Sequence, residues 1–145
     1  MHDLPRKLSV EELAELFEGR TRFVERLAEL EDPLRVARTL VHELSDEEKR
    51  EVLDGHPAIG ARRLSARSAR EQGTDDDPAV LAELARLNVE YERRFGFRFV
   101  VFVNRRTKSE ILPILRERLG RTREQELETA LDELVAIAED RWRRG

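Results

Sequence analysis

The three histidines are the side chains of this sequence best suited to proton transfer near neutral pH, and their contexts differ. His2 lies close to the first residue. His42 lies near the end of a predicted helix, where positive charge is favourable. His56 lies between Gly55 and Pro57 in the segment DGHPAIG. This local pattern favours an exposed turn residue over a catalytic group, because Gly55 can end a helix in the left-handed conformation and Pro57 cannot continue it.

Two further side chains each have a structural and a chemical interpretation. Glu71 follows Ser68 at the spacing of a capping box, which favours a helix start. The same carboxylate could instead face a cavity, where it would hold a substrate hydroxyl or orient an imidazole. Arg141 is either a solvated cation near a helix C-terminus or a clamp for a carboxylate, which a guanidinium matches with two hydrogen bonds. The residues alone leave both choices open.

Several kinds of site are excluded or disfavoured by residue type. The sequence has no cysteine, which excludes disulfides, thiolate nucleophiles and zinc–cysteine sites. It contains no glycine-rich phosphate loop with its lysine and no Gly-x-Ser-x-Gly elbow. His42 and His56 do not have the spacing of a metal-binding pair and lack a clear third ligand, so we expect no metal site.

Length and charge limit the class of protein. The 145 residues are typical of one domain, and we expect a single domain over residues 1–145. The 27 basic and 31 acidic residues leave a net charge of -4 with the two signs interspersed, so nucleic acid is not an expected partner. No apolar run approaches the ~20 residues of a membrane span, and the first residues lack the apolar core of a signal peptide. We therefore expect a soluble, cytoplasmic protein.

The elements that must position these residues are helices with clear start signals. Capping-box spacing, in which Ser or Thr is followed three residues later by Glu or Gln, occurs at Ser9–Glu12, Ser45–Glu48, Ser68–Glu71, Thr107–Glu110 and Thr122–Gln125. Apolar residues at helical spacing support the predicted helices. In the helix from about residue 33, we expect the apolar face to carry Val36, Leu40 and Leu44.

One segment breaks the helical pattern. Phe95–Val103 (FGFRFVVFV) is rich in aromatic and β-branched residues, which are typical of a strand. Because no second strand is predicted to pair with it, we expect an extended, buried connector over about residues 97–103, with Gly96 able to turn the chain at positive φ. Amides that such a connector leaves unpaired are available to a ligand. The predicted fold is all-α, a single-domain helical bundle of about seven to nine helices.

Four segments in order, HPAIG, LSARSAREQ, LNVEYERRFGFRFVV and ELETALDELVAIAEDR, resemble the pattern of one family. It is the OHCU decarboxylase family, whose substrate is 2-oxo-4-hydroxy-4-carboxy-5-ureidoimidazoline (OHCU), an intermediate of purine catabolism. The resemblance covers about residues 50 to 141. The sequence departs from the family pattern in the first ~45 residues, after Gln72, and at Arg98, where the family has proline.

The resemblance implies an all-α homodimer that needs no cofactor and acts on a small ureidoimidazoline acid to form (S)-allantoin. It implies His56 as the catalytic imidazole, and our hypothesis is that His56 and Glu71 together manage the hydroxyl proton and the protonation that sets the S configuration. Arg141 would hold the urea or carboxylate end. The implied substrate contacts are Pro57, Ser68, Gln72, Phe99, Val100, Val101, Phe102, Val103 and Arg141, of which residues 99–103 act through their backbone.

Two alternatives to this decarboxylase stay open. The first is a catalytically silent helical interaction domain of the same fold, which would be expected to lose His56, Glu71 or Arg141; all three are present. The second is an enzyme of the same fold that acts on a related ureido acid. The atypical first third of the sequence keeps both in consideration.

Overall fold

The structure is a computed structural model, and it describes residues 7–56 and 77–144. Helix is the only regular secondary structure in these two ranges, which contain no strand. The helices are α1 (Val10–Phe17), α2 (Arg22–Leu27), α3 (Pro33–His42), α4 (Asp46–Asp54), α6 (Pro78–Phe95), α7 (Lys108–Leu119) and α8 (Arg123–Arg144). The predicted all-α class is confirmed, and the seven helices of the described ranges agree with the predicted number.

The predicted helix starts are confirmed wherever they fall in the described residues. Reciprocal capping boxes begin α1, α4 and α7 at Ser9–Glu12, Ser45–Glu48 and Thr107–Glu110. Thr122 and Gln125 exchange the same two bonds, each 3.1 Å long, at the start of α8. Such bonds satisfy amides that have no intrahelical partner, so they fix where each helix begins. The predicted box at Ser68–Glu71 lies outside the described residues.

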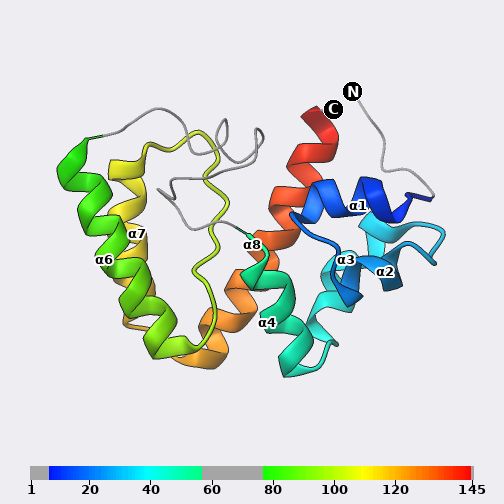
Figure 1. The fold of residues 1–145 in the computed structure, drawn as a ribbon, viewed down its shortest axis with the longest axis horizontal. Coiled ribbons are helices and arrows are strands. Elements are labelled where there is room, and N and C mark those ends of the chain that lie inside the picture. Colours follow the sequence, from blue (N-terminus) through cyan, green and yellow to red (C-terminus); the bar gives the residue numbers. More distant parts are fainter. Residues whose placement is uncertain (1–6, 57–76, 145) are drawn as a thin grey trace.

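The other helices are arranged around α8, which is 22 residues long. In Figure 1, α8 runs through the middle of the molecule (orange to red), with α1, α2 and α3 on one side and the pair α6 and α7 on the other. It packs against α1, α3 and α4, while α6 packs against α7. Leu127, Leu131, Leu134 and Ala138 of α8 are buried and recur at helical spacing, as predicted.

The predicted apolar face of α3 is partly wrong. Leu44, just beyond the helix, is buried as expected, but Val36 is 39% exposed. Leu34 and Val41 lie in the core instead. Because α3 carries apolar residues on more than one face, its sequence would allow either the face with Val36 or the face with Leu34 and Val41 to point into the core. Packing against α2 and α8 selects the second.

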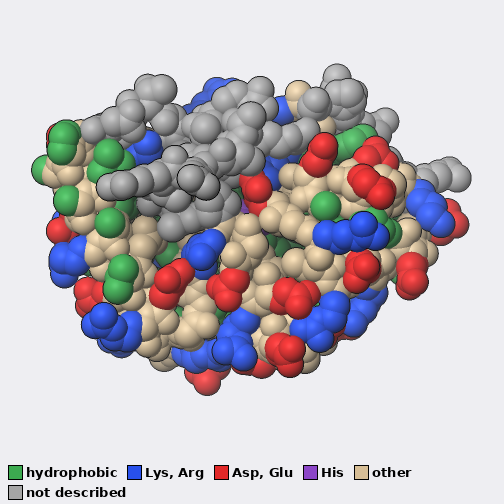
Figure 2. All heavy atoms as spheres, in the orientation of Figure 1, with side chains coloured by type: hydrophobic (Ala, Val, Ile, Leu, Met, Phe, Trp, Pro, Cys, Tyr) green, Lys and Arg blue, Asp and Glu red, His purple; other side chains and the backbone are tan. Residues whose placement is uncertain are grey.

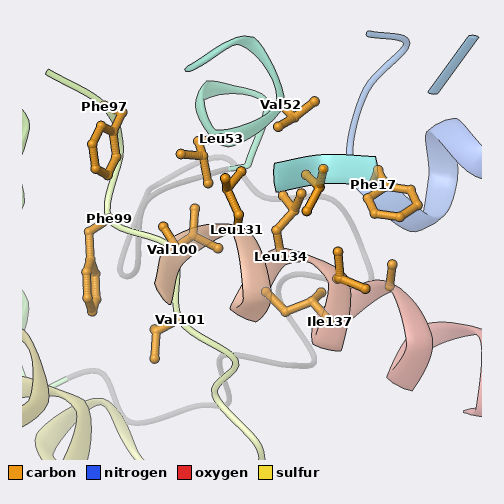
Figure 3. Packing of buried hydrophobic residues seen from close by; sticks show 14 of the residues in the cluster. Phe17, Val52, Leu53, Phe97, Phe99, Val100, Val101, Leu131, Leu134 and Ile137 are labelled. Atoms are coloured by element: carbon orange, nitrogen blue, oxygen red, sulfur yellow. The ribbon is translucent and has the colours of Figure 1, made fainter. Parts of the chain in front are cut away.

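The segment between α6 and α7 is an extended, buried connector, as predicted. Residues 97–103 form neither helix nor strand. Gly96 ends α6 at a φ of 82°, which confirms the expected positive φ. Phe97, Phe99 and Val100 are at most 3% exposed, and Figure 3 shows them in one buried cluster with residues of α4 and α8. Aromatic and branched side chains therefore hold the connector by packing, without strand pairing.

A buried polar network fixes this connector against α6, α7 and α8. Glu126, which is fully buried, accepts hydrogen bonds from the Tyr91 hydroxyl (2.6 Å) and from Arg118 Nε (2.7 Å). Arg118 Nη1 donates to the Val100 carbonyl at 2.9 Å, and the guanidinium lies 4.6 Å from the centre of the Phe99 ring. Burial and the bond to Glu126 raise the pKa of Tyr91, so the phenol stays protonated. A buried charge needs such partners, and here they tie three helices to one loop.

The described surface is strongly charged. Figure 2 shows acidic and basic side chains intermingled over the described part of one face, as the sequence pattern indicates. None of the described helices combines the length and the apolar character needed to span a membrane.

Candidate functional site

His56 follows the end of α4, and its own amide donates to the Leu53 carbonyl at 3.2 Å. The expectation that Gly55 takes the left-handed conformation is wrong, because its φ is -70° and its ψ is -23°. Space explains this glycine better than conformation does. A Cβ at Gly55 would lie 3.3 Å from the Glu18 carbonyl oxygen, closer than nearly all real Cβ contacts. The turn before His56 is therefore pressed against the end of α1.

The expectation of an exposed turn histidine is also wrong. His56 is only 4% exposed. Within the described part of the chain, neither Nδ1 nor Nε2 of its ring has a hydrogen-bond partner. A buried polar group without a partner is costly, so native structures rarely retain one unless it has a function. This imidazole is the strongest indication of a functional site in the described residues.

The electrostatic surroundings keep this imidazole neutral. Burial is the main cause that lowers the pKa of His56 to about 3, and the positive charges of Arg141 and Arg98 lower it further, while Glu18 opposes them. Near neutral pH the ring therefore carries one N–H donor and one nitrogen lone pair. Such a group can accept a proton or a hydrogen bond from a ligand, and donate one as well.

Arg141 approaches the same site from α8. It is 2% exposed, so the interpretation as a solvated cation is wrong. Its Nη1 donates to the carbonyls of Glu15 (3.2 Å) and Leu16 (3.3 Å), and its Nη2 donates to the Glu18 carboxylate at 3.0 Å. Carbonyls of the last helical turn have no intrahelical partner, and Arg141 supplies one for α1. Its charge also acts on His56.

Glu18 and Arg98 complete the group around His56, and sequence reasoning assigned a role to neither. Glu18 caps the C-terminus of α1 in the left-handed conformation, at a φ of 59°. Arg98 donates from Nη1 to the carbonyls of Asp54 and His56. The only sequence signal for Arg98 was its departure from the family's proline. No local signal marks Glu18, because its role depends on Arg141 and His56, which are distant in the sequence.

The connector residues predicted to bind substrate are placed as a backbone site requires. The side chains of Phe99, Val100, Val101 and Val103 lie in the core, and only Phe102 is half-buried. Of the amides over residues 99–103, only that of Phe102 finds an acceptor among the described residues, the Glu133 carboxylate at 3.3 Å. The remaining amides have no acceptor within residues 7–56 and 77–144, which leaves them as candidates for ligand binding.

The remaining predicted site residues, Pro57, Ser68, Glu71 and Gln72, lie outside the described residues. The charge of Arg141 therefore acts on the His56 ring, and Arg98 bonds the start of the connector to the main chain of His56. No group of three or more His, Asp or Glu side chains in the described ranges is arranged to hold a metal.

Comparisons with known proteins show which proteins this chain is similar to. Among curated proteins, the chain is 36% identical over 93 residues to 2-oxo-4-hydroxy-4-carboxy-5-ureidoimidazoline decarboxylase of Amia calva, covering 58% of this chain and 53% of that protein. It is 32% identical over 114 residues to the protein of the same name from Haloferax volcanii, covering 74% of this chain and 68% of that protein. The chain thus spans about half the length of the Amia calva relative.

Solved structures and a family model extend the match. The crystal structure of OHCU decarboxylase in the presence of (S)-allantoin superposes with a TM-score of 0.77 at 26% identity, covering 92% of this chain and 96% of that one. The crystal structure of (S)-allantoin synthase gives a TM-score of 0.69 at 26% identity, over 93% of this chain and 48% of that one. The family model described as OHCU decarboxylase matches residues 2–143. The chain therefore belongs to the OHCU decarboxylase family.

Proposed function

We propose that this protein decarboxylates OHCU to (S)-allantoin in urate degradation. Family membership supports the reaction type. The observation that carries the proposal is the His56 imidazole, which is buried, neutral and without a hydrogen-bond partner among the described residues. A silent interaction domain gains nothing from such a group, because its burial costs free energy that a bound ligand would offset.

The chemistry of the substrate fits a site that offers acid–base groups. In OHCU one carbon carries both the carboxylate and a hydroxyl, and it adjoins a C=N bond. When the bond to the carboxylate breaks, carbon dioxide leaves and its electron pair moves toward that C=N, whose nitrogen takes up a proton. Loss of the hydroxyl proton and protonation of the carbon that bears the ureido group then give allantoin. The substrate is its own electron sink, so the expected reaction needs no cofactor.

We assign the two proton transfers to His56 and Glu71, with the order between them open. The lone pair of a neutral imidazole can take the hydroxyl proton, and delivery of a proton to one face of the ureido-bearing carbon sets the S configuration. Arg141 would hold the urea or carboxylate end of the substrate. The amides of residues 99–103 that have no acceptor among the described residues would bind its ring carbonyl and related acceptors, with Pro57, Ser68 and Gln72 as further contacts.

Three broader expectations accompany this proposal. We propose one domain over residues 1–145, supported by a family model that matches nearly this whole range. We propose a homodimer on the basis of the family resemblance, and light scattering after size-exclusion chromatography would measure its mass. The cytoplasmic location expected from the sequence stays a prediction.

The activity can be tested directly. OHCU is generated from urate with an oxidase and a hydrolase, this protein is added at once, and the circular dichroism of (S)-allantoin is followed. We expect a signal that rises faster than in the protein-free reaction, which decays to racemic product. A rate equal to the spontaneous one would refute the proposed function and favour the silent interaction domain.

The same assay tests the role of His56. We expect His56→Asn to abolish most of the activity while the far-ultraviolet spectrum stays helical. His42→Asn is the matched control, because His42 is partly exposed, its Nε2 pairs with Asp132 at 2.8 Å, and it is not one of the predicted substrate contacts. Full activity of His56→Asn would show that another group carries out the proton transfer.

A further inference from the structure

Arg98 joins three parts of the molecule at the turn that carries His56. Its guanidinium donates from Nη1 to the carbonyls of Asp54 (3.1 Å) and His56. Its own amide donates to Asp54 Oδ1 at 3.2 Å. Its Nε donates to Glu92 Oε1 of α6 at 3.1 Å. The side chain is thus held from α6 on one side and holds the main chain of the His56 turn on the other.

The end of α4 explains why such a side chain is needed. Helices often end with a left-handed residue that closes the last carbonyls by hydrogen bonds from the following amides. Gly55 is right-handed, at a φ of -70°, so this closure does not form in the usual way. The Asp54 carbonyl instead accepts a bond from Arg98, which comes from a distant segment. The direction in which the chain leaves α4, and hence the direction of the imidazole, depends on this contact.

The charges that face His56 come from several elements. Arg98 on the connector and Arg141 on α8 disfavour a protonated ring, whereas Glu18 at the end of α1 favours one. Asp54, on the same turn, accepts the Arg98 amide. Arg98 is therefore near the imidazole electrostatically as well as bonded to its main chain.

We propose that Arg98 is a positioning residue of this active site, which aims the His56 imidazole by holding the carbonyls of Asp54 and His56. The proposal rests on the proposed function, since it concerns the same imidazole. Arg98 is also the first polar residue of the connector that carries the predicted substrate-binding amides. One side chain thus sets the distance between the proton-transfer group and the backbone that would hold the substrate.

Three variants separate positioning from charge. Arg98→Met removes both the charge and the two carbonyl contacts. Arg98→Lys keeps the charge but lacks the rigid fork of donors. Arg86→Met is the matched control, because the Arg86 side chain is 63% exposed on α6 and, within the described part of the chain, forms ion pairs with Glu83 and Glu90 on its own helix. Each variant is assayed for kcat and KM with fresh OHCU, and the ring nitrogens of His56 are titrated by NMR, with His56→Asn assigning the signal.

We expect Arg98→Met to lower kcat about 10- to 100-fold with a smaller change in KM, because misplacement of a catalytic group acts mainly on the transition state. The pKa of His56 should rise in this variant, since Arg98 lowers it in the wild type. Arg98→Lys should lose much of kcat while the His56 titration stays close to that of the wild type. Arg86→Met should leave both readouts unchanged.

Wild-type kcat together with unchanged His56 ring signals in Arg98→Met would overturn the proposal. If Arg98→Met does not fold, Arg98→Lys is assayed by the same two readouts. Wild-type kcat in Arg98→Lys would show that the guanidinium donors of Arg98 do not position His56. If the wild type itself does not act on OHCU, the proposed function fails separately. The chemical shifts of the neutral His56 ring then decide alone: a changed shift at an unchanged pKa in Arg98→Lys, but not in Arg86→Met, supports positioning, and no change overturns it.

Discussion

At the scale of single residues, the site combines two arginines and one carboxylate around a neutral imidazole. Arg98 and Arg141 both disfavour the protonated form of His56, and Glu18 only partly compensates. The field of the two arginines at the ring would also attract the carboxylate of an anionic substrate. Arg141 already donates to Glu18, so a substrate clamp at this position would have to share the guanidinium with that carboxylate.

Arg141 should consequently matter for stability as well as for binding. Arg141→Met removes a side chain that is 2% exposed and leaves the Glu18 carboxylate and two carbonyls of α1 without these bonds. We expect a loss of about 3 kcal/mol in the free energy of unfolding, measured by urea denaturation. The pKa of His56 should rise at the same time, because Arg141 lowers it.

Arg144→Met is the control for this prediction. Arg144 lies one turn further along α8, and its ion pair with Asp140 is 54% exposed on the arginine side. Exposed pairs of this kind are worth little, so the expected loss is below about 0.5 kcal/mol. Equal losses in the two variants would contradict the buried role of Arg141.

At the scale of elements, Gly55 and Gly96 each end a helix but are glycine for different reasons: at Gly55 a Cβ would crowd the Glu18 carbonyl, and at Gly96 the backbone has a positive φ. Gly96 lies at a φ of 82°, which disfavours any residue with a Cβ, although nothing lies within 4 Å of the place a Cβ would take. Gly96→Ala should therefore destabilise the protein by about 1 kcal/mol through backbone strain alone. Gly19→Ala is the control, since Gly19 has equal space and no positive φ. Thermal denaturation of both variants measures the loss of stability. An equal loss in Gly96→Ala and Gly19→Ala would show that the positive φ is not the cause.

Features that depend on nearby residues were predictable, whereas those that depend on distant contacts were not. Capping boxes act between residues three positions apart, so the spacing of Ser45 and Glu48 predicts the start of α4 from the sequence alone. The connector was predictable because an apolar segment without a possible strand partner has to be buried by packing. Gly55 was mispredicted because the reason for its glycine is the Glu18 carbonyl 3.3 Å from its Cβ position rather than a left-handed φ, and local sequence carries no information on that contact.

At the scale of the whole molecule, the site could be predicted only in part. The turn at His56 was visible in the sequence, but the burial of the ring depends on α1, α8 and the connector meeting there. Arg98 and Glu18 were missed for the same reason. Motif resemblance favoured a role for His56 where local chemistry favoured an exposed turn residue, because the family pattern carries tertiary information that a single turn does not.

Burial of a neutral histidine also links the stability of the whole protein to pH. The folded-state pKa of His56 is lowered to about 3, whereas an unfolded chain titrates near the ordinary histidine value of about 6.5. Between these two values the unfolded state binds more protons than the folded state, so the free energy of unfolding rises with pH. The contribution of neutral His56 to the free energy of unfolding is fully present above pH 6.5 and is lost as the pH falls toward 3.

Lowering the pH from 7 to 5 should therefore cost the wild type about 2 kcal/mol through His56 alone, since each pH unit below 6.5 corresponds to about 1.4 kcal/mol. Urea denaturation of the wild type and of His56→Asn at both pH values isolates this share, because the carboxylates with lowered pKa, such as Glu48 and Glu51, titrate alike in both proteins. The variant should lose about 2 kcal/mol less than the wild type. The same loss in both would mean that His56 can be protonated without leaving its buried site, and a proton-transfer role would then have to start from the imidazolium.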